Sequence, residues 1–574
     1  MHLLDDRLCV LDAVSGRLRV VATGVAEYAC DRLATVATYA AGGRIFRVRL
    51  LHDEDSGNGV PAGPQDLGLG GEQPRPDPAG RHLAYRRGRA IYVLAEGAAE
   101  PALLAGEEPD EVCWGGIDDD AQGFGRDRGW WWAPDGTSIL AVRSDGPHNS
   151  SLHLLELDGG WVDVHWDRWI YPYVATVTWD DGPPLITVLR RSQNHGLVLA
   201  VDPRTGETQV HAELSDPRFV RTVDGTPCQL ADGRVLVGSE IAHESYDARC
   251  LFADGTLLTP PNLYVRRVVG KLGPGALDAE LGDLLVEAST DPAEQHLYRV
   301  RGALGRGGGI TAQRITHEPG WHDGECGGPT VVIGSSGLDF PGTRWHVLHH
   351  GVVAGSLGSP GTVTAYHGNV PRPALDRVTD RRLPVGVLYP PRHLLGRRLP
   401  VLLDLPAGLG GQGVVARSQA WQERQSWAEA GFAVIAVDTR GSTGVAPSFE
   451  KVVHRRLADL MVADLAETVQ ELGTKDPDLD LGHVLLRGTG IGGWLAACAV
   501  RDRPEIFRGA VVRAPVRTWD DLPPVVGERY LGHPEDNGEV WAHHDLRVLP
   551  DGVVEMAPAA STEDEVATLR TLLM

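Results

Sequence analysis

Short apolar runs separated by polar turns fill the first two thirds of the chain. Typical runs cover residues 81–85, 138–142 and 234–237, and the turns between them repeatedly contain Asp-Gly, as at residues 135–136 and 232–233. Asp-Gly turns between apolar runs are strong hairpin signals, and their regular recurrence is typical of propeller blades. The pattern therefore predicts an all-β domain, and it favours a β-propeller over the alternative, an irregular pair of β-sandwiches.

From about residue 380 the pattern changes to continuous apolar strands that alternate with helices. Strands are expected over residues 399–404, 432–438, 483–486 and 509–515, and helices over residues 418–430, 457–472, 494–500 and 562–573. Buried strands separated by helices indicate a parallel sheet that is covered on both faces. We therefore expect two domains, a β-propeller over residues 1–368 and an α/β domain over residues 369–574.

The turn at residues 487–494 has the build of a nucleophile elbow. A buried strand leads into it and a helix of small residues leads out, as the motif G-x-S-x-G of α/β-hydrolases requires. The sequence here is Arg-Gly-Thr-Gly-Ile-Gly-Gly-Trp, so Gly490 stands where the nucleophilic serine would be. The turn predicts a hydrolase fold and, in the same residues, argues against hydrolysis.

Charge and composition exclude several kinds of partner. The net charge of −23 argues against nucleic acids and anionic membrane surfaces. No apolar run approaches the ~18 residues of a membrane span, and the first residues lack the pattern of a signal peptide. The seven cysteines are scattered singly, which favours reduced thiols in the cytoplasm. No cofactor is expected, and no metal either, because residues 322–326, although rich in ligand types, are interpreted as an ordinary blade strand.

Motifs along nearly the whole chain resemble the prolyl oligopeptidase superfamily of serine peptidases, most closely its dipeptidyl peptidase IV branch. Residues 129–136, Gly-Trp-Trp-Trp-Ala-Pro-Asp-Gly, are similar to the branch's propeller motif G-Y-W-W-S-P-D-G. Further motifs match in the same order at residues 335–342, 438–442, 513–519 and 528–532. The resemblance implies an eight-bladed propeller followed by an α/β-hydrolase domain, with the active site between them.

Followed residue by residue, the same resemblance implies that the catalytic groups are lost. The nucleophile position is Gly490, and Pro406 stands where the family has a tyrosine hydroxyl in the oxyanion hole. The backbone N–H of Ile491 remains as an oxyanion donor that could still point into the hole.

The substrate-binding groups differ as well. Gln122 and Gly123 stand at the positions of the paired glutamates that anchor a substrate's N-terminal amine, although residues 118–120 are all aspartate. Leu522 and Val526 replace the two tyrosines that line the family's proline-sized pocket. These four residues are the candidate lining of a vestigial substrate cleft.

The end of the chain lacks the family's remaining motifs. Only 44 residues follow Tyr530, and none resembles the strands that carry the catalytic aspartate and histidine, so a truncated hydrolase domain is expected. His543, His544 and Asp545 are in the wrong order for a triad of this fold. We interpret them as solvated loop residues.

Three residues near the elbow could in principle replace the nucleophile. Thr489 is adjacent to it, but neighbouring side chains on a sharp turn point in different directions. Ser442 lies in a loop where serine is more often structural, and Cys498 lies two turns along the elbow helix, where core packing is expected.

Three functions remain open. The favoured one is a non-catalytic peptidase relative that binds a peptide or protein between its domains, because losing the nucleophile or base alone costs around 10⁶ in turnover. The second is a truncated subunit that works in a homo- or hetero-oligomer formed through the hydrolase domain, whose early end would leave an unpaired sheet edge. The third is a serine-type dipeptidyl or prolyl peptidase with an unrecognised mechanism.

Overall fold

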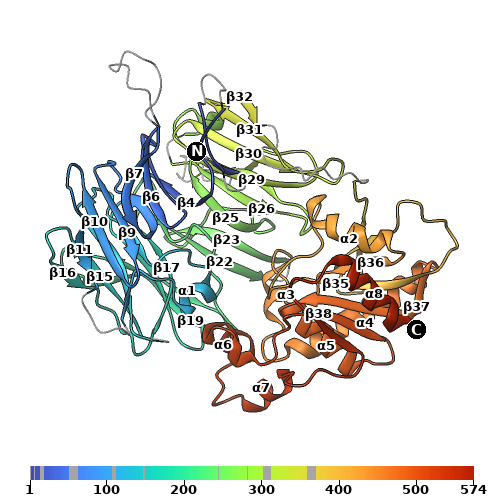
Figure 1. Cartoon of the computed structure of the whole chain (residues 1–574). Coiled ribbons are helices and arrows are strands. Elements are labelled where there is room, and N and C mark those ends of the chain that lie inside the picture. The colour runs from blue at the N-terminus through green and yellow to red at the C-terminus, as the bar shows by residue number, and fades with distance from the viewer. Residues whose placement is uncertain are drawn as a thin grey trace.

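The protein consists of a β-propeller and an α/β domain that lie side by side (Figure 1). The structure is a computed structural model that describes residues 2–4, 7–12, 18–50, 63–106, 112–146, 149–243, 245–280, 282–301, 312–357 and 370–574. The predicted boundary between residues 368 and 369 falls within residues 358–369, which lie outside this description. None of the helices in the described ranges is long and apolar enough to cross a bilayer.

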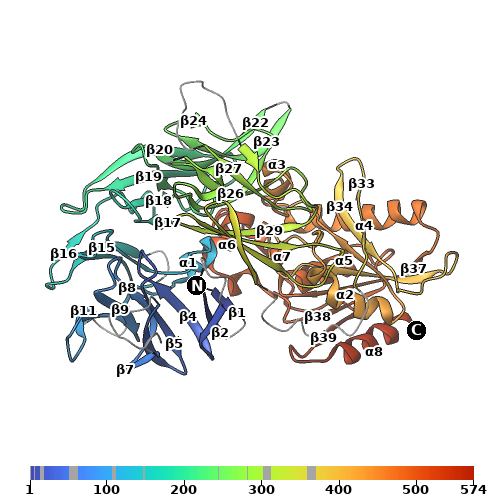
Figure 2. The same ribbon diagram turned by 90° about the horizontal axis from the view of Figure 1, so that it is seen from above.

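Seven antiparallel sheets of four or five strands make up the propeller, and they follow one another along the chain (Figures 1 and 2). The first two contain β4 (Val25–Cys30), β5 (Val36–Ala41), β6 (Arg44–Arg49) and β7 (Gln65–Gly70), then β8 (Glu72–Pro76), β9 (His82–Arg87), β10 (Ala90–Ala95) and β11 (Ala102–Ala105). The third and fourth contain β12 (Cys113–Trp114), β13 (Trp130–Trp132), β14 (Ser138–Ser144), β15 (Ser150–Glu156) and β16 (Trp161–Asp163), then β17 (Tyr173–Thr178), β18 (Leu185–Leu189), β19 (His195–Val201) and β20 (Thr208–Ser215).

The remaining three sheets complete the series. They contain β21 (Cys228–Gln229), β22 (Val235–His243), β23 (Tyr246–Ala253) and β24 (Thr256–Leu257), then β25 (Tyr264–Lys271), β26 (Leu284–Ser289), β27 (His296–Val300) and β28 (Ala312–Arg314), and finally β29 (Trp321–Gly327), β30 (Thr330–Ser336), β31 (Arg344–His349) and β32 (Val352–Leu357). A short helix, α1 (Asp119–Phe124), interrupts the third sheet between β12 and β13.

The expectation of eight blades is not confirmed. The strands at the N-terminus, β1 (His2–Leu4), β2 (Arg7–Leu11) and β3 (Leu18–Ala22), form a sheet of only three strands within the described residues. Its apolar side chains, such as Leu8 and Val21, pack on Val25 and Tyr39 of the first four-stranded sheet. The family resemblance implied eight blades, but matching motifs do not show how many strands join each sheet.

The α/β domain is built on one seven-stranded sheet with the order β33-β34-β36-β35-β37-β38-β39. The strands are β33 (Ala374–Val378), β34 (Leu383–Leu388), β35 (Leu399–Leu405), β36 (Ala433–Val437), β37 (Leu479–Thr489), β38 (Gly509–Arg513) and β39 (Val553–Met556). Strands β36, β35, β37, β38 and β39 pair in parallel, whereas β33 and β34 are antiparallel to their neighbours. The predicted parallel sheet is confirmed.

Helices cover both faces of this sheet. They are α2 (Gln419–Glu429), α3 (Pro447–Lys451), α4 (Leu457–Lys475), α5 (Ile491–Asp502), α6 (Pro524–Leu531), α7 (Gly538–His544) and α8 (Thr562–Leu573). The apolar residues of α4 and α5 share one core with alternate residues of the strands, and those of α2 and α8 share the core on the opposite face. Burial on both faces is why the central strands are continuously apolar.

One strand follows Tyr530, although none of the last 44 residues resembles the family strands that carry the catalytic aspartate and histidine. Strand β39 pairs in parallel with β38, from Ala510 opposite Val553 to Arg513 opposite Met556. It has four residues, none of them fully buried, so its apolar pattern is too short to indicate a strand.

The predicted C-terminal helix is present as α8. It begins with a capping box between Ser561 and Asp564 and buries Leu569 completely. Its Glu565 carboxylate is also buried, and it accepts hydrogen bonds from Arg487 at 2.7 Å and from Arg513 at 2.6 Å. Helix α8 is thus held to β37 and β38 by charge as well as by packing.

Candidate functional site: the elbow and the interdomain cavity

The turn between β37 and α5 has the backbone of a nucleophile elbow without a nucleophile. Gly490 has φ 56° and ψ −119°, a conformation that side chains rarely adopt and that glycine reaches without strain. Gly492 is needed for a different reason, because a Cβ atom there would lie 2.5 Å from the carbonyl oxygen of Pro406. The loop after β35 therefore lies directly against the elbow.

This loop also occupies the oxyanion position. The backbone N–H of Ile491, expected to point into an open hole, donates instead to the carbonyl oxygen of Ala407 at 3.1 Å. Pro406, next to Ala407, has neither an N–H nor a hydroxyl to offer. Oxyanion stabilisation needs donors that are free to meet developing negative charge. At this turn the one predicted donor already has a partner within the chain.

The interpretation of His544 as a solvated loop residue is wrong. It ends α7 and is 1% exposed, and its ring stacks on Trp494 of the elbow helix with 5.9 Å between centroids. Its Nε2 accepts a hydrogen bond from the backbone N–H of Ala458 at 3.1 Å, and its Nδ1 lies 2.7 Å from the carbonyl oxygen of Val540. Burial lowers the pKa of His544, so the ring is held neutral with both nitrogens engaged.

The other late candidates also have structural partners. His543 is exposed and forms an ion pair with Asp459 at 2.9 Å, and Asp545 accepts a hydrogen bond from the backbone N–H of Trp519. The segment after β39, residues 557–561, reads Ala-Pro-Ala-Ala-Ser and contains no carboxylate or imidazole. None of these residues forms a base and acid pair at the elbow.

The three possible substitute nucleophiles are not activated. Thr489 is exposed, and no base is hydrogen-bonded to its hydroxyl among the described residues. Ser442 is 4% exposed. Cys498 is fully buried in the core, and burial raises the pKa of its thiol to about 12. A thiol with so high a pKa is not a nucleophile at neutral pH.

The predicted cleft residues come from α1 of the propeller and from α6 with the turn before it. These two helices pack against each other between the domains (Figure 2). A Cβ atom on Gly123 would lie 1.9 Å from Val525 Cγ1, so the absence of a side chain at Gly123 is what lets α6 approach. Arg529 of α6 donates to the Gly123 carbonyl oxygen at 3.2 Å and to Gln193 Oε1 at 2.8 Å.

A cavity of about 320 Å³ opens beside this contact, and we call it the interdomain cavity. Gln122, Gly123 and Val526 line it, together with Arg221, Arg529 and Leu409. Leu409 comes from the same loop as Pro406 and Ala407. The fourth predicted cleft residue, Leu522, packs instead against the core of the α/β domain.

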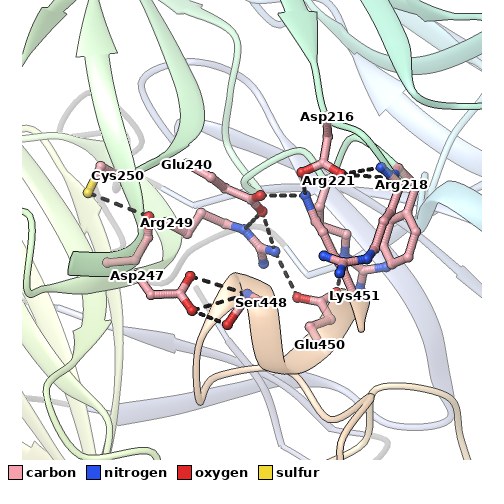
Figure 3. Close-up of polar contacts among 12 residues, drawn as sticks. Asp216, Arg218, Arg221, Glu240, Asp247, Arg249, Cys250, Ser448, Glu450 and Lys451 are labelled. Carbon is pink, nitrogen blue, oxygen red and sulfur yellow. Dashed lines mark hydrogen bonds and ion pairs between the residues drawn. The ribbon is translucent and has the colours of Figure 1, made fainter. Parts of the chain in front are cut away.

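A second set of contacts joins the domains through charge. Glu450 of α3 accepts a hydrogen bond from Arg249 of β23 at 2.8 Å and lies 3.5 Å from Arg221 (Figure 3). Lys451 pairs with Asp216 at 2.8 Å and with Glu240. We call these six residues the ionic cluster.

Neighbouring arginines favour the ionised form of Glu450 in this cluster. Burial alone would raise the pKa of Glu450, but Arg249 and Arg221 more than offset it and keep the pKa of this carboxyl below its usual value. Sequence reasoning missed the cluster. The available signal was the pair Glu450-Lys451, which stands inside the apolar run Phe449 to Val453.

Comparisons with known proteins agree with this architecture. Residues 418–546 match the prolyl oligopeptidase family. Human dipeptidyl peptidase 8 is 32% identical over 155 residues, which cover 26% of this chain and 17% of the relative. Dipeptidyl peptidase family member 2 of Caenorhabditis elegans is 27% identical over 176 residues, covering 29% of this chain and 21% of the relative. The matched segments therefore span about a fifth of the length of these relatives.

The likeness of fold extends over the whole chain. The crystal structure of Porphyromonas gingivalis dipeptidyl peptidase 4 superposes with a TM-score of 0.76 and 16% sequence identity. The match covers 98% of this chain and 88% of that structure.

Proposed function

Because this chain belongs to the prolyl oligopeptidase family and has a dipeptidyl peptidase 4-like fold, we propose that it is a non-catalytic relative of these peptidases. Its function is to bind a peptide or a protein in the interdomain cavity rather than to cleave one. Its partner is thus a peptide or protein ligand, and it needs no cofactor.

One observation carries this proposal, the hydrogen bond from Ile491 N–H to the Ala407 carbonyl oxygen. This bond engages the N–H donor that a tetrahedral intermediate would need. The adjacent Gly490 has no side chain that could act as a nucleophile and form such an intermediate. Restoring one group would therefore leave the others absent.

The enzymatic alternative is tested with a fluorophosphonate probe and with Gly-Pro and Ala-Pro chromogenic substrates. We expect no labelling and no turnover of the full chain under conditions in which an active dipeptidyl peptidase 4 is labelled and turns over. Labelling of one residue together with turnover that co-purifies with the chain would overturn the proposal and would identify the nucleophile.

Ligand binding is tested by isothermal titration calorimetry with short Xaa-Pro peptides. We expect binding without product formation, checked by mass spectrometry of the recovered peptide. Failure of every peptide to bind would remove the peptide-binding form of the proposal.

Strand β39 favours a second candidate function, that of a subunit in a larger assembly. It pairs with β38 alone within the described residues, so its other edge has free backbone groups, which favour pairing with another chain. A homo- or hetero-oligomer would then form through the α/β domain. A monomer in multi-angle light scattering would contradict the homo-oligomeric form of this candidate.

None of the seven cysteines, all of which lie within the described ranges, forms a disulfide. Cysteines without disulfides are usual in reducing compartments, so we propose a cytoplasmic location. Fractionation of the source cells tests this assignment.

A further inference from the structure

A buried positive charge without an anionic partner lies at the interdomain cavity. Arg529 is 5% exposed, and its hydrogen bonds go to the carbonyl oxygen of Gly123 and to the amide oxygen of Gln193, both neutral acceptors. It forms no ion pair with a carboxylate within the described residues. Its second terminal amino group, Nη2, makes no hydrogen bond there either.

The surroundings of Arg529 make this charge costly. Burial, with the nearby positive charge of Arg221, lowers the pKa of Arg529 to about 10, so the guanidinium is still charged at neutral pH. A buried charge is normally paired, because removing it from water without a partner costs several kcal/mol. An arginine left in this state is therefore a natural contact for an anion.

The carboxylates near this arginine do not neutralise it. Glu528 is bonded to Tyr173 and Arg191, and Glu450 to Arg249 and Arg221. Asp224, the one acidic residue that lines the cavity, is exposed, so water screens its charge. Gln122 is uncharged and also lines the cavity.

We propose that the interdomain cavity binds a carboxylate, supplied by a peptide C-terminus or by a small organic acid, and that Arg529 is the residue that recognises it. A guanidinium offers a planar set of N–H donors that matches a carboxylate, and Nη2 is still available for such a contact. The cavity volume of about 320 Å³ falls at the lower end of the range for small-molecule sites. The inference rests on the proposed binding function and specifies the chemistry of the ligand.

Two matched peptides test the charge that the cavity selects. N-acetyl-Ala-Pro has a free carboxylate and no amine, whereas Ala-Pro-amide has a free amine and no carboxylate. Titrated into the full chain, the acetylated peptide should bind about tenfold more tightly or better, since a charged hydrogen bond contributes about 1.5–3 kcal/mol. N-acetylalanine, run in parallel, distinguishes a small organic acid from a peptide C-terminus as the natural source.

Variants assign the effect to Arg529. Arg529→Gln should weaken the binding of N-acetyl-Ala-Pro about tenfold or more, whereas Arg218→Gln, in a separate cavity beside the ionic cluster, should leave it unchanged. Asp224→Asn removes an exposed negative charge and should strengthen binding about twofold to fivefold. This exposed substitution tests the charge argument even if the buried one disturbs folding.

The outcomes separate this inference from the proposed function. Tighter binding of Ala-Pro-amide than of N-acetyl-Ala-Pro would overturn the carboxylate site and leave peptide binding intact. Binding of the acetylated peptide that is indifferent to Arg529→Gln and to Asp224→Asn would overturn the role of Arg529. Absence of binding by both peptides would contradict the proposed function and the inference together.

Discussion

At the scale of single residues, Gly490 is one part of a turn whose neighbouring groups also lack catalytic chemistry. Its conformation matches the elbow geometry, and the N–H of the next residue, Ile491, donates to the carbonyl oxygen of Ala407. A Cβ atom added at Gly490 would itself lie 3.1 Å from that same oxygen. The turn and the loop after β35 now fit each other.

Gly490→Ser should therefore fail to restore peptidase activity. The hydroxyl would have no base, and the oxyanion donor would remain bonded to Ala407. The positive φ should also cost about 1–3 kcal/mol of folding stability. Hydrolysis of Ala-Pro-p-nitroanilide and thermal denaturation measure the two effects. Turnover above that of the unmodified chain would contradict this account of the elbow.

Asp120 on α1 gives a pH-dependent prediction. Burial, together with the neighbouring Asp118 carboxylate, raises the pKa of Asp120 to about 7. The unfolded chain titrates near its ordinary value of about 4, so the folded state binds the proton more tightly and loses stability as the pH rises from about 4 to about 7. Asp120→Asn removes this loss.

The unfolding free energy of Asp120→Asn, taken relative to that of the unmodified protein, should rise by about 2–4 kcal/mol when the pH is raised from 5 to 8. Urea unfolding at the two pH values measures it. Asp119→Asn, at the exposed neighbouring position, is the matched control and should show little change. An equal response of the two variants would contradict the burial argument.

What could be predicted at this scale depended on chemistry that is local in sequence. The absence of a nucleophile at Gly490 follows from the strand–turn–helix context alone. The partners of Ile491 and His544 do not, because Ala407 and Ala458 lie far from them along the chain. Hydrogen-bond partners distant in sequence decide whether a donor is open or a histidine is buried.

At the scale of elements, α8 completes the α/β domain on the face that it shares with α2. Its Glu565 carboxylate joins β37 and β38 through Arg487 and Arg513, and Arg487 also bonds to Asp404 of β35 at 2.5 Å. Several elements thus meet at one buried charge network.

Glu565→Gln should destabilise the domain by about 3–5 kcal/mol, because it leaves Arg513 without its anion and removes one of the carboxylates that Arg487 pairs with. Glu563→Gln, in the same helical turn but exposed, should change stability by less than about 0.5 kcal/mol. Differential scanning calorimetry compares the two. Equal effects would show that α8 is held by its apolar face alone.

Long elements with regularly spaced apolar residues could be predicted from the sequence, and short elements could not. The strands at 399–405 and 433–437 and the helices α2, α4 and α8 follow from periodicity alone. Strand β39 and helices α6 and α7 do not, because each is short and derives its stability from neighbours. The number of blades could not be predicted from the sequence either, since it depends on how the strands pair.

At the scale of the whole molecule, two of the contacts between the domains lie beside the interdomain cavity. One is the packing of α6 on α1, and the other is the ionic cluster, in which Glu450 is fully enclosed between Arg249 and Arg221. The interdomain cavity lies where these contacts meet, since Arg221 belongs to both the cluster and the cavity wall.

Glu450→Gln should uncouple the domains. It leaves Arg249 and Arg221 without their shared carboxylate, a loss of about 3–5 kcal/mol at the interface. Calorimetry should then resolve two separate unfolding transitions at a lower temperature. Glu467→Gln, which removes an exposed ion pair with Arg381, is the control and should leave the transition unchanged. A single unshifted transition in Glu450→Gln would contradict the coupling role of the cluster.

The bond between Ile491 and Ala407 also has an evolutionary consequence. Active sites commonly keep strained backbone and unsatisfied polar groups ready for a substrate, at the expense of stability. This elbow has neither a strained backbone nor a free donor. Gly490 adopts the turn without strain, and the N–H of Ile491 is hydrogen-bonded to Ala407. Under the proposed non-catalytic function, a gain of catalysis would first have to undo that local stabilisation. The arrangement would then make the absence of a nucleophile hard to reverse, and the neighbouring cavity would be free to change with the ligand that it binds.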